Sequence, residues 1–355
     1  MSFTPYNAPL LSSLLGDVEI AANFSVKSDI DAMLKFEAAL ARAQSEFGLI
    51  PEEHIQIIEQ TCLEFEPDMM LLQSGVAQDG MAVPELIRQL RLACGDEVSP
   101  SLHFGSTSQD VVDTSLALRL VAVNNLLNQR LTQILEAIEI IDKNFGDKVL
   151  LARTRMQAAL PVTVTHRLEQ WHNPLEDLAA NYEKIADSIH VVQLGGPVGT
   201  LAKMNGKGPE IRVRLAQLLE LNDPGEIWHT DRTRLATYCN WLAGICSVLG
   251  KVGQDIVLMA QNGIDELSFE GAGSSSAMAH KQNPVKAEML VTLARFSATL
   301  VSGMHHNAVH EQERSGISWT YEWLVVPQLC VVAGASLRNA NLLLRSVTGI
   351  GANEG

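Results

Sequence analysis

The chain has 355 residues, of which 46% are hydrophobic and 19% are charged, so it can bury a large core in two or three structural regions. Its formal net charge is −15, a balance that repels the phosphates of nucleic acids and anionic lipid surfaces. Both are therefore excluded as main partners, and an enzyme for anionic substrates would need a local basic pocket.

The five cysteines lie far apart and form no C-x-x-C pair, which argues against a disulfide framework and against a thiolate metal site. The N-terminus has no cationic stretch followed by an apolar run. No segment has the roughly 18 uninterrupted apolar residues of a membrane span. We therefore expect a soluble protein of the reducing cytoplasm.

Shorter helices are predicted in roughly the first 100 residues, including residues 29–47 and 84–94. From Ser106 to Phe145 the chain contains no Gly or Pro, and apolar side chains recur at three- and four-residue steps. The repeat consists of Leu120, Val123, Leu127, Leu131, Ile134, Leu135, Ile138 and Ile141. This pattern predicts one long amphipathic helix, which needs bundle or coiled-coil packing to cover its apolar face.

Further long helices are predicted at about residues 162–192, 232–262, 285–314 and 317–347. The sequence has no βαβ alternation and no strand-rich zone. These patterns predict an all-α fold: a helical domain at residues 1–100, a central long-helix bundle at 101–347 that carries the functional motifs, and a short tail at 348–355. Long helices that are apolar on more than one face also favour a homo-oligomer.

The first segment with chemical potential is HFGSTSQDVVDT, which begins at His103 and leads directly into the first long helix. In the simplest interpretation it is a helix cap, with Thr107 as the N-cap and Asp110 as its capping-box partner. The same geometry surrounds a positive helix end with backbone N–H groups, the hydroxyls of Thr107 and Ser108, and the imidazole of His103. Such an arrangement suits a carboxylate.

A second segment, RTRMQAALPVT, contains two closely spaced arginines. Arg153 and Arg155 provide permanent positive charge and the paired N–H donors that bind carboxylates. Ordinary surface salt bridges are the alternative interpretation for either arginine.

A third segment, GAGSSSAMAHKQNP at residues 271–284, has the composition of a flexible linker between helices. Met278, Lys281, Asn283 and Pro284 are hard to explain in a linker. Anchored on these residues, the segment resembles the signature Gly-Ser-Ser-x-Met-Pro-x-Lys-x-Asn-Pro of the fumarase/aspartase superfamily, whose mobile serine loop it encodes. Ser275 then stands at the position of the catalytic serine.

The other segments resemble the same superfamily. HFGSTSQDVVDT is similar to its first motif, and RTRMQAALPVT is similar to a motif that usually begins Arg-Thr-His, with Arg155 in place of the histidine. The S-Q-D sequence resembles the carboxymuconate cycloisomerase branch, as do GGPVGTL at 195–201, WHTDRTR at 228–234 and HEQERSGISWTYEW at 310–323. This resemblance extends from about Gln78 to the C-terminus. Ser274 and Ala279 depart from the serine-loop signature, where Gly and Pro are usual.

The resemblance implies carbanion chemistry on a small polycarboxylate. The implied reaction is the reversible lactonisation of 3-carboxy-cis,cis-muconate through an aci-carboxylate, in the protocatechuate branch of the β-ketoadipate pathway. It also implies that Ser275 carries the proton on carbon and that Lys281 stabilises the aci-carboxylate, with no cofactor and no metal. The usual imidazole role cannot be assigned to Arg155.

The resemblance further implies which residues bind the substrate and how the protein assembles. The implied substrate-binding residues are His103, Thr107, Ser108, Arg153, Arg155, Gln157, His229, His280, Asn283 and Arg314. A homotetramer with active sites shared between subunits is expected. Relatives normally carry a further small helical domain at the C-terminus, which we expect to be truncated or absent here.

Three alternatives remain open. The first is an adenylosuccinate lyase-like enzyme, although residues 77–84 lack the histidine found there in adenylosuccinate lyases. The second is a catalytically silent structural homologue, although Ser275, Lys281 and Asn283 are all present. The third is metal binding by His306 and His310, one helical turn apart, with Glu313, and His305 nearby, although no complete ligand motif such as H-E-x-x-H occurs.

Overall fold

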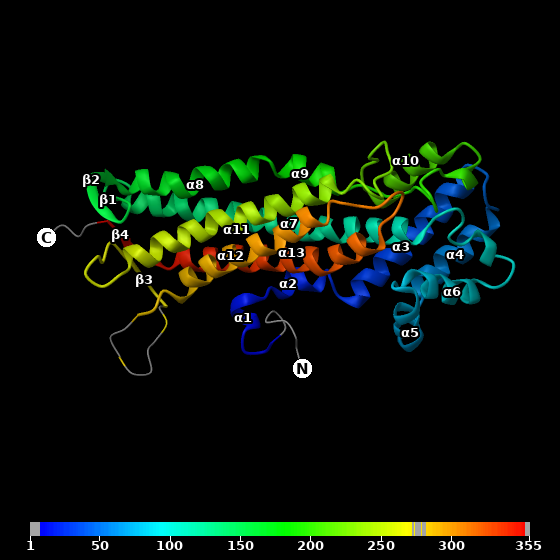
Figure 1. The fold of residues 1–355 in the computed structure, drawn as a ribbon, viewed down its shortest axis with the longest axis horizontal. Helices are drawn as coiled ribbons and strands as arrows, with labels where there is room; N and C mark the ends of the chain where they lie inside the picture. The colour runs from blue at the N-terminus through cyan, green and yellow to red at the C-terminus, as the bar shows by residue number, and fades with distance from the viewer. Residues whose placement is uncertain (1–7, 272, 274–277, 279–281, 352–355) are drawn as a thin grey trace.

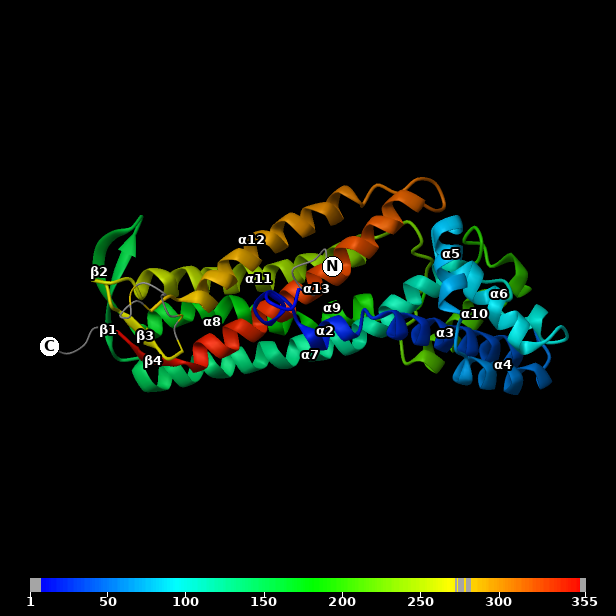
Figure 2. The same ribbon diagram turned by 90° about the horizontal axis from the view of Figure 1, so that it is seen from below.

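The computed structural model describes residues 8–271, 273, 278 and 282–351. It is an elongated molecule in which long helices run side by side along the longest axis (Figures 1 and 2). These helices are α7 (Ser108–Phe145), α8 (Val164–Ala180), α9 (Tyr182–Ile189), α11 (Thr233–Met259), α12 (Val285–His306) and α13 (Gly316–Arg345). The predicted mostly helical bundle is therefore confirmed.

The long helix α7 forms where the apolar repeat predicts it. The buried side chains of the repeat, each at most 4% exposed, are Leu120, Val123, Leu127, Leu131, Ile134, Ile138 and Ile141. They pack in the bundle core against side chains of α8, α11 and α13. At 1.5 Å per residue, the 38 residues of α7 span roughly 57 Å.

A second, smaller core joins the N-terminal helices to α10 (Gly208–Leu219). The other helices of the N-terminal part are α1 (Ser12–Leu15), α2 (Val18–Ala22), α3 (Val26–Glu46), α4 (Glu53–Glu64), α5 (Met69–Asp79) and α6 (Val83–Cys94). Local signals define their ends: the Asp68 carboxylate caps α5, and Gly80 with φ 74° terminates it. Short 3-10 turns occur at Ser99–Ser101 and Ala202–Met204.

The two ends of the bundle differ. At one end, here called the head end, the N-terminus of α7 lies near α4, α5, α6 and α10 (Figure 2). At the other, here called the sheet end, lie two small antiparallel sheets. One pairs β1 (Val149–Thr154) with β2 (Gln157–Thr163), and the other pairs β3 (Leu267–Phe269) with β4 (Val347–Ile350). Sequence periodicity did not predict these short strands.

The helix predicted at residues 162–192 differs from the structure at both its start and its middle. Val162 and Thr163 pair with Leu150 and Val149 in the β1–β2 hairpin, so the helix starts two residues later than predicted. The Thr163 hydroxyl then accepts the His166 N–H at 3.2 Å and caps α8. Asn181 separates α8 from α9. The prediction that residues 285–314 form one helix was also wrong, because α12 ends at His306.

Two helices, α11 and α13, are long and apolar enough to cross a membrane by length and composition alone. More than half of each apolar window is buried inside this fold, so core packing accounts for their apolar character. All five cysteines are buried and free of disulfides.

Candidate functional site

The N-terminus of α7 is built as the sequence predicts. Thr107 is the N-cap, and its backbone N–H donates to the Asp110 carboxylate at 3.1 Å. The Ser106 hydroxyl also donates to Asp110, at 3.3 Å. The predicted capping box is confirmed, and it fixes the positive end of α7 beside Ser108.

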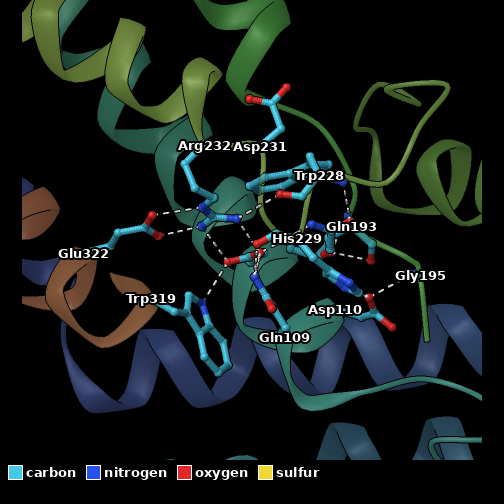
Figure 3. A network of polar contacts seen from close by, with 12 residues as sticks. Gln109, Asp110, Gln193, Gly195, Trp228, His229, Asp231, Arg232, Trp319 and Glu322 are labelled. Carbon is cyan, nitrogen blue, oxygen red and sulfur yellow. Dashed lines mark hydrogen bonds and ion pairs between the residues drawn. The ribbon is translucent and has the colours of Figure 1, made fainter. Parts of the chain in front are cut away.

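Asp110 does much more than cap the helix. Its fully buried carboxylate accepts the backbone N–H groups of Gly195 and Gly196 at 2.9 Å each, and it lies 2.8 Å from Nε2 of His229. A Cβ at Gly195 would lie 2.7 Å from the His229 ring, so this close approach requires glycine. One carboxylate thus joins three segments that are far apart in the sequence: the first motif, the GGPVGTL loop and the WHTDRTR loop (Figure 3).

Next to Asp110 lies a buried group of charges centred on Arg232. Its guanidinium donates to Asp113 at 2.8 and 3.0 Å and to Glu322 on α13 at 2.9 and 2.5 Å (Figure 3). The Trp228 ring covers the guanidinium at 4.7 Å, and the indole N–H of Trp319 donates to Asp113 at 3.1 Å. Burial alone would lower the pKa of Arg232, but the two carboxylates outweigh it and raise that pKa. The guanidinium therefore stays charged and holds α7, the WHTDRTR loop and α13 together.

Sequence reasoning missed this network. Local patterns predict Asp110 and Asp113 as capping or solvent-facing carboxylates, and they indicate no role for Arg232 and Glu322. The available signal was weak, because Arg232 lies 119 residues from Asp113 and 90 residues from Glu322 along the chain.

His103 lies at the head end in contact with α3. Its Nδ1 is 2.6 Å from the fully buried Glu37 carboxylate, which leaves Nε2 as the ring nitrogen for any substrate. Burial lowers the pKa of His103, but the charge and hydrogen bond of Glu37 outweigh it, so the pKa is raised. The imidazolium form is favoured, which suits the binding of an anion.

This pair makes a pH-dependent contribution to stability. The folded pKa of His103 lies above its unfolded value of about 6.5, so the stabilisation is complete below that value and is lost as pH rises through the raised pKa. We expect Glu37→Gln to cost more unfolding free energy at about pH 5.5 than at about pH 9. Urea titrations of both proteins at the two pH values measure this, and an equal cost at both would refute the pairing.

Arg314 and His229 also lie at the head end. Nη2 of Arg314 donates to the Pro197 carbonyl at 2.9 Å, beside the glycines held by Asp110. Nε of Arg314 is buried without a hydrogen-bond partner among the described residues, so it is a donor available to a ligand. Thr107, Ser108, His103, His229 and Arg314 therefore lie at one end of the molecule.

Other predicted residues lie at the sheet end instead. Arg153 forms an ion pair with Glu266 at 2.7 Å, and Gln157 pairs with Thr154 in the β1–β2 hairpin. Asn283 exchanges two backbone hydrogen bonds with Gly273, each 2.9 Å long. Ser275, His280 and Lys281 lie outside the described residues.

The β1–β2 hairpin has a strained tip. Its two-residue loop is Arg155-Met156, with φ values of 50° and 65°. Positive φ at both positions is what a type I′ turn requires, and glycine or asparagine usually supplies it. Here an arginine and a methionine adopt the left-handed region, at a cost of roughly 1–2 kcal/mol each.

A polar cavity of about 350 Å³ opens beside this hairpin. Four cationic side chains line it, those of Arg153, Arg155, Arg167 and Lys251, together with the carboxylates of Asp255 and Glu266. The lining thus has an excess of two positive charges on a chain whose net charge is −15. An excess of positive charge of this kind suits an anionic ligand.

The two groups of predicted residues cannot meet within one chain. Thr107 precedes the first residue of α7, and the hairpin follows its last, so roughly 57 Å of straight helix separates them. A site that uses both groups requires the head end of one subunit and the sheet end of another.

The metal-site alternative does not have its expected geometry. Because α12 ends at His306, His310 lies in the following loop and the two are not on one helical face. The ring of His305 lies 3.1 Å from the Asn240 side chain, and that of His310 is buried 3.8 Å from Glu322. Within the described residues, no group of three or more His, Cys, Asp or Glu side chains is arranged to hold a metal ion.

Comparison with known proteins gives a consistent set of relatives. A family profile described as lyase matches residues 18–297. The chain is 34% identical over 354 residues to the 3-carboxy-cis,cis-muconate cycloisomerase of Pseudomonas aeruginosa, covering 98% of this chain and 77% of that protein. It is 29% identical over 331 residues to an N-acetyl-S-(2-succino)cysteine lyase of Enterococcus italicus, covering 92% and 72%.

A solved structure resembles the whole described fold. The crystal structure of the 3-carboxy-cis,cis-muconate lactonizing enzyme from Pseudomonas putida matches with a TM-score of 0.90 and 30% sequence identity. The match covers 96% of this chain and 78% of that one. Similar proteins therefore include enzymes with different substrates.

Proposed function

Because this chain belongs to the fumarase/aspartase superfamily of lyases, we propose that it is a cycloisomerase that converts 3-carboxy-cis,cis-muconate to carboxymuconolactone in protocatechuate degradation. The relatives of this name, at 34% identity to one and with a TM-score of 0.90 to another, support this substrate. The observation that carries the proposal is the presence of two groups of anion-binding residues at opposite ends of the chain: segments resembling that branch form the head end, and a superfamily motif forms the sheet end.

The head end supplies donors for carboxylates. The backbone N–H groups at the start of α7 and the hydroxyls of Thr107 and Ser108 surround the positive helix terminus. His103 adds an imidazolium and Arg314 an unpaired buried N–H. Such fixed donors suit one or two carboxylates of the substrate.

The sheet end supplies the remaining positive charge. Arg153 is already paired with Glu266, whereas Arg155 forms no ion pair within the described part of the chain. The guanidinium of Arg155 is therefore the one we assign to a substrate carboxylate. In most superfamily lyases the equivalent residue is a histidine, so Arg155 replaces a proton carrier with a permanent charge.

We propose that the protein is a cytoplasmic homotetramer in which each active site combines residues from different subunits. The separation of the two ends supports this, and so does the apolar surface of a single chain. On the β1–β2 hairpin, the side chains of Leu160 and Met156 are 72% and 70% exposed. Because an isolated hairpin is only marginally stable in water, this exposed apolar surface favours contact with a partner. On α13, Ile317, Tyr321 and Leu324 form an exposed stripe at four- and three-residue spacing. Neighbouring subunits would cover both.

The reaction needs no resident cofactor. A carboxylate oxygen of the substrate attacks one carbon of a C=C bond, and the electron pair moves to the other carbon and into its carboxylate as an aci-carboxylate. The C–O bond formed in this attack closes the lactone ring. Ser275 then gives its proton to the other carbon and regains a proton from solvent water. Lys281 and the two anion-binding ends stabilise the extra negative charge of the intermediate.

An ultraviolet assay tests the proposal. On adding the protein to 3-carboxy-cis,cis-muconate at about pH 7, the absorbance of the conjugated diene should fall as the lactone forms. A second assay follows fumarate release from N-acetyl-S-(2-succino)cysteine, because a lyase for this compound is among the relatives. A third arm uses adenylosuccinate. Loss of the diene supports the cycloisomerase, whereas fumarate release without diene loss would contradict it, and inactivity in all arms would favour a silent homologue.

The strained hairpin tip yields a matched pair of variants. Met156→Gly and Arg155→Gly both relieve a left-handed residue, so each should leave the unfolding free energy unchanged or raise it by about 1 kcal/mol. Only Arg155→Gly should lower turnover, at least about tenfold, because it removes a charge that binds substrate. Urea unfolding and the diene assay measure the two effects. Equal turnover of the two variants would remove Arg155 from the site.

A further inference from the structure

Helix α3 supports the loop that carries His103 through two buried side chains. Oε1 of Glu37 lies 2.6 Å from Nδ1 of His103. The side-chain amide of Gln44 donates to the Phe104 carbonyl at 2.5 Å. Glu37 and Gln44 are seven residues apart, so they lie on one face of α3, and each is at most 1% exposed. The loop is thus held at two consecutive residues by side chains to which no role in substrate binding is assigned above.

The backbone of His103 has a conformation that a residue with a Cβ rarely adopts. Its φ is 60°, in the left-handed region, which costs conformational free energy. Such strain persists only where the surrounding structure enforces it, and it is concentrated at functional sites. The contacts of Glu37 and Gln44 enforce it here. Nδ1 of the ring then faces α3, whereas Nε2 makes no hydrogen bond within the described residues and the side chain remains 14% exposed.

Glu37 has a single hydrogen-bond partner in the described part of the chain. Its Oε1 contacts His103, and its Oε2 is buried without a partner. Burying a carboxylate is costly, and an apolar side chain would serve packing alone at least as well. The contribution of Glu37 at this position is therefore its interaction with His103.

The charged groups around the ring of His103 favour its cationic form. Burial lowers the pKa of His103, but the charge and the hydrogen bond of Glu37 outweigh it. The charge of Asp110 on α7 adds to the effect of Glu37, and that of Arg91 on α6 opposes it. On α4, the thiol of Cys62 near Glu37 stays neutral because burial raises its pKa. Glu37 is thus the main group that stabilises the imidazolium.

We propose that Glu37 is a positioning residue for the reaction, which holds the Nε2–H of His103 toward the substrate and provides the countercharge for an imidazolium that binds a carboxylate. This inference rests on the proposed function, because it concerns the same carboxylate-binding end. An imidazolium N–H forms a charge-assisted hydrogen bond with a carboxylate, which is stronger than the bond that a neutral ring forms. Substrate binding should therefore weaken as the pH rises through the pKa of His103. Without Glu37, that decline should begin at a lower pH.

The pH dependence of kcat/KM for 3-carboxy-cis,cis-muconate tests the proposal in Glu37→Gln, which keeps an acceptor for Nδ1 and removes the charge. The decline of kcat/KM at high pH should move down by about one pH unit or more, with the loss in KM and little change in kcat. A decline with the wild-type midpoint would overturn the proposal.

Two further variants control this measurement, with unfolding midpoints confirming that each variant folds. Gln44→Leu alters the same face of α3 and the same loop without changing a charge, so it should keep the wild-type pH midpoint. His103→Asn removes the ring and suits left-handed backbone, so it should abolish this pH dependence. If Glu37→Gln does not fold, the comparison of wild type with His103→Asn decides, because equal pH dependence of these two proteins would overturn the proposal.

Titration calorimetry with tricarballylate, a saturated tricarboxylate that cannot lactonise, tests the proposal without turnover. At about pH 7 the assembled wild-type protein should bind it roughly fivefold more tightly than Glu37→Gln, because less of the variant has a protonated ring. Glu37→Gln should also take up more protons on binding, measured as heats in two buffers of different ionisation enthalpy. Equal affinity and proton uptake, or no binding by wild type, would overturn the proposal. Binding as expected without conversion of 3-carboxy-cis,cis-muconate would support it and contradict the proposed function alone.

Discussion

Replacing Arg232 with methionine is expected to destabilise the fold by about 3–5 kcal/mol. The guanidinium is the cationic partner of Asp113 and Glu322, and each of these carboxylates is only 2% exposed. Its removal leaves two negative charges buried near each other, and the indole N–H of Trp319 cannot compensate for them. Urea unfolding at a fixed protein concentration measures the loss.

A surface arginine provides the matched control. Arg214 forms an ion pair with Glu46, and both side chains are at least one-third exposed. Arg214→Met should cost far less unfolding free energy than Arg232→Met, because solvent screens such pairs. Adding Asp113→Asn and Glu322→Gln to Arg232→Met should recover part of the loss. If Arg232→Met alone is no more costly than Arg214→Met, the network does not hold the head end together.

Replacing Ser275 with alanine is expected to lower kcat at least about 100-fold, with little change in protein stability. The expectation rests on its proposed role as the group that carries the proton on carbon. Without the hydroxyl, the aci-carboxylate can be protonated only by water or a misplaced donor. Single-turnover kinetics with 3-carboxy-cis,cis-muconate measure the step directly.

The flanking serines provide the control for this variant. Ser274→Ala and Ser276→Ala alter the same loop and remove the same group, so their kcat should stay within a few-fold of wild type. A near-normal kcat for Ser275→Ala would exclude it as the proton carrier. An equal loss of kcat in all three variants would indicate that the composition of the segment matters and that no individual hydroxyl carries the proton.

The parts of the fold that depend on local patterns were predictable. The apolar repeat from Leu120 to Ile141 corresponds to the buried face of α7, and Thr107 with Asp110 forms the predicted cap. The two small sheets were not predictable in this way. Leu267 pairs with Ile350, and strands of three and four residues are too short for a clear alternation.

The candidate site residues likewise divide into those that local motifs indicate and those that only the packing of the whole chain brings together. Motif resemblance indicates candidate residues such as Ser108 and Arg155, but no local pattern indicates that they lie at opposite ends of one chain. The buried partners of Arg232 were missed because Asp113 lies 119 residues and Glu322 90 residues away. Such contacts are decided by packing of the whole chain. The left-handed backbone of Arg155 and Met156 was equally hidden, because nothing in their side chains favours it.

Activity of mixed oligomers tests the central claim, that one active site combines the head end of one subunit with the sheet end of another. Arg314→Met removes the unpaired donor proposed to bind substrate at the head end, and Arg155→Ala removes the guanidinium assigned to substrate at the sheet end. Each variant alone should lose most of its turnover of 3-carboxy-cis,cis-muconate. Co-expressed with two affinity tags and purified as mixed oligomers, they should recover about a quarter of wild-type activity, because each end of a site is intact with a probability of one-half. Activity no higher than the sum of the two separate variants would contradict a shared site.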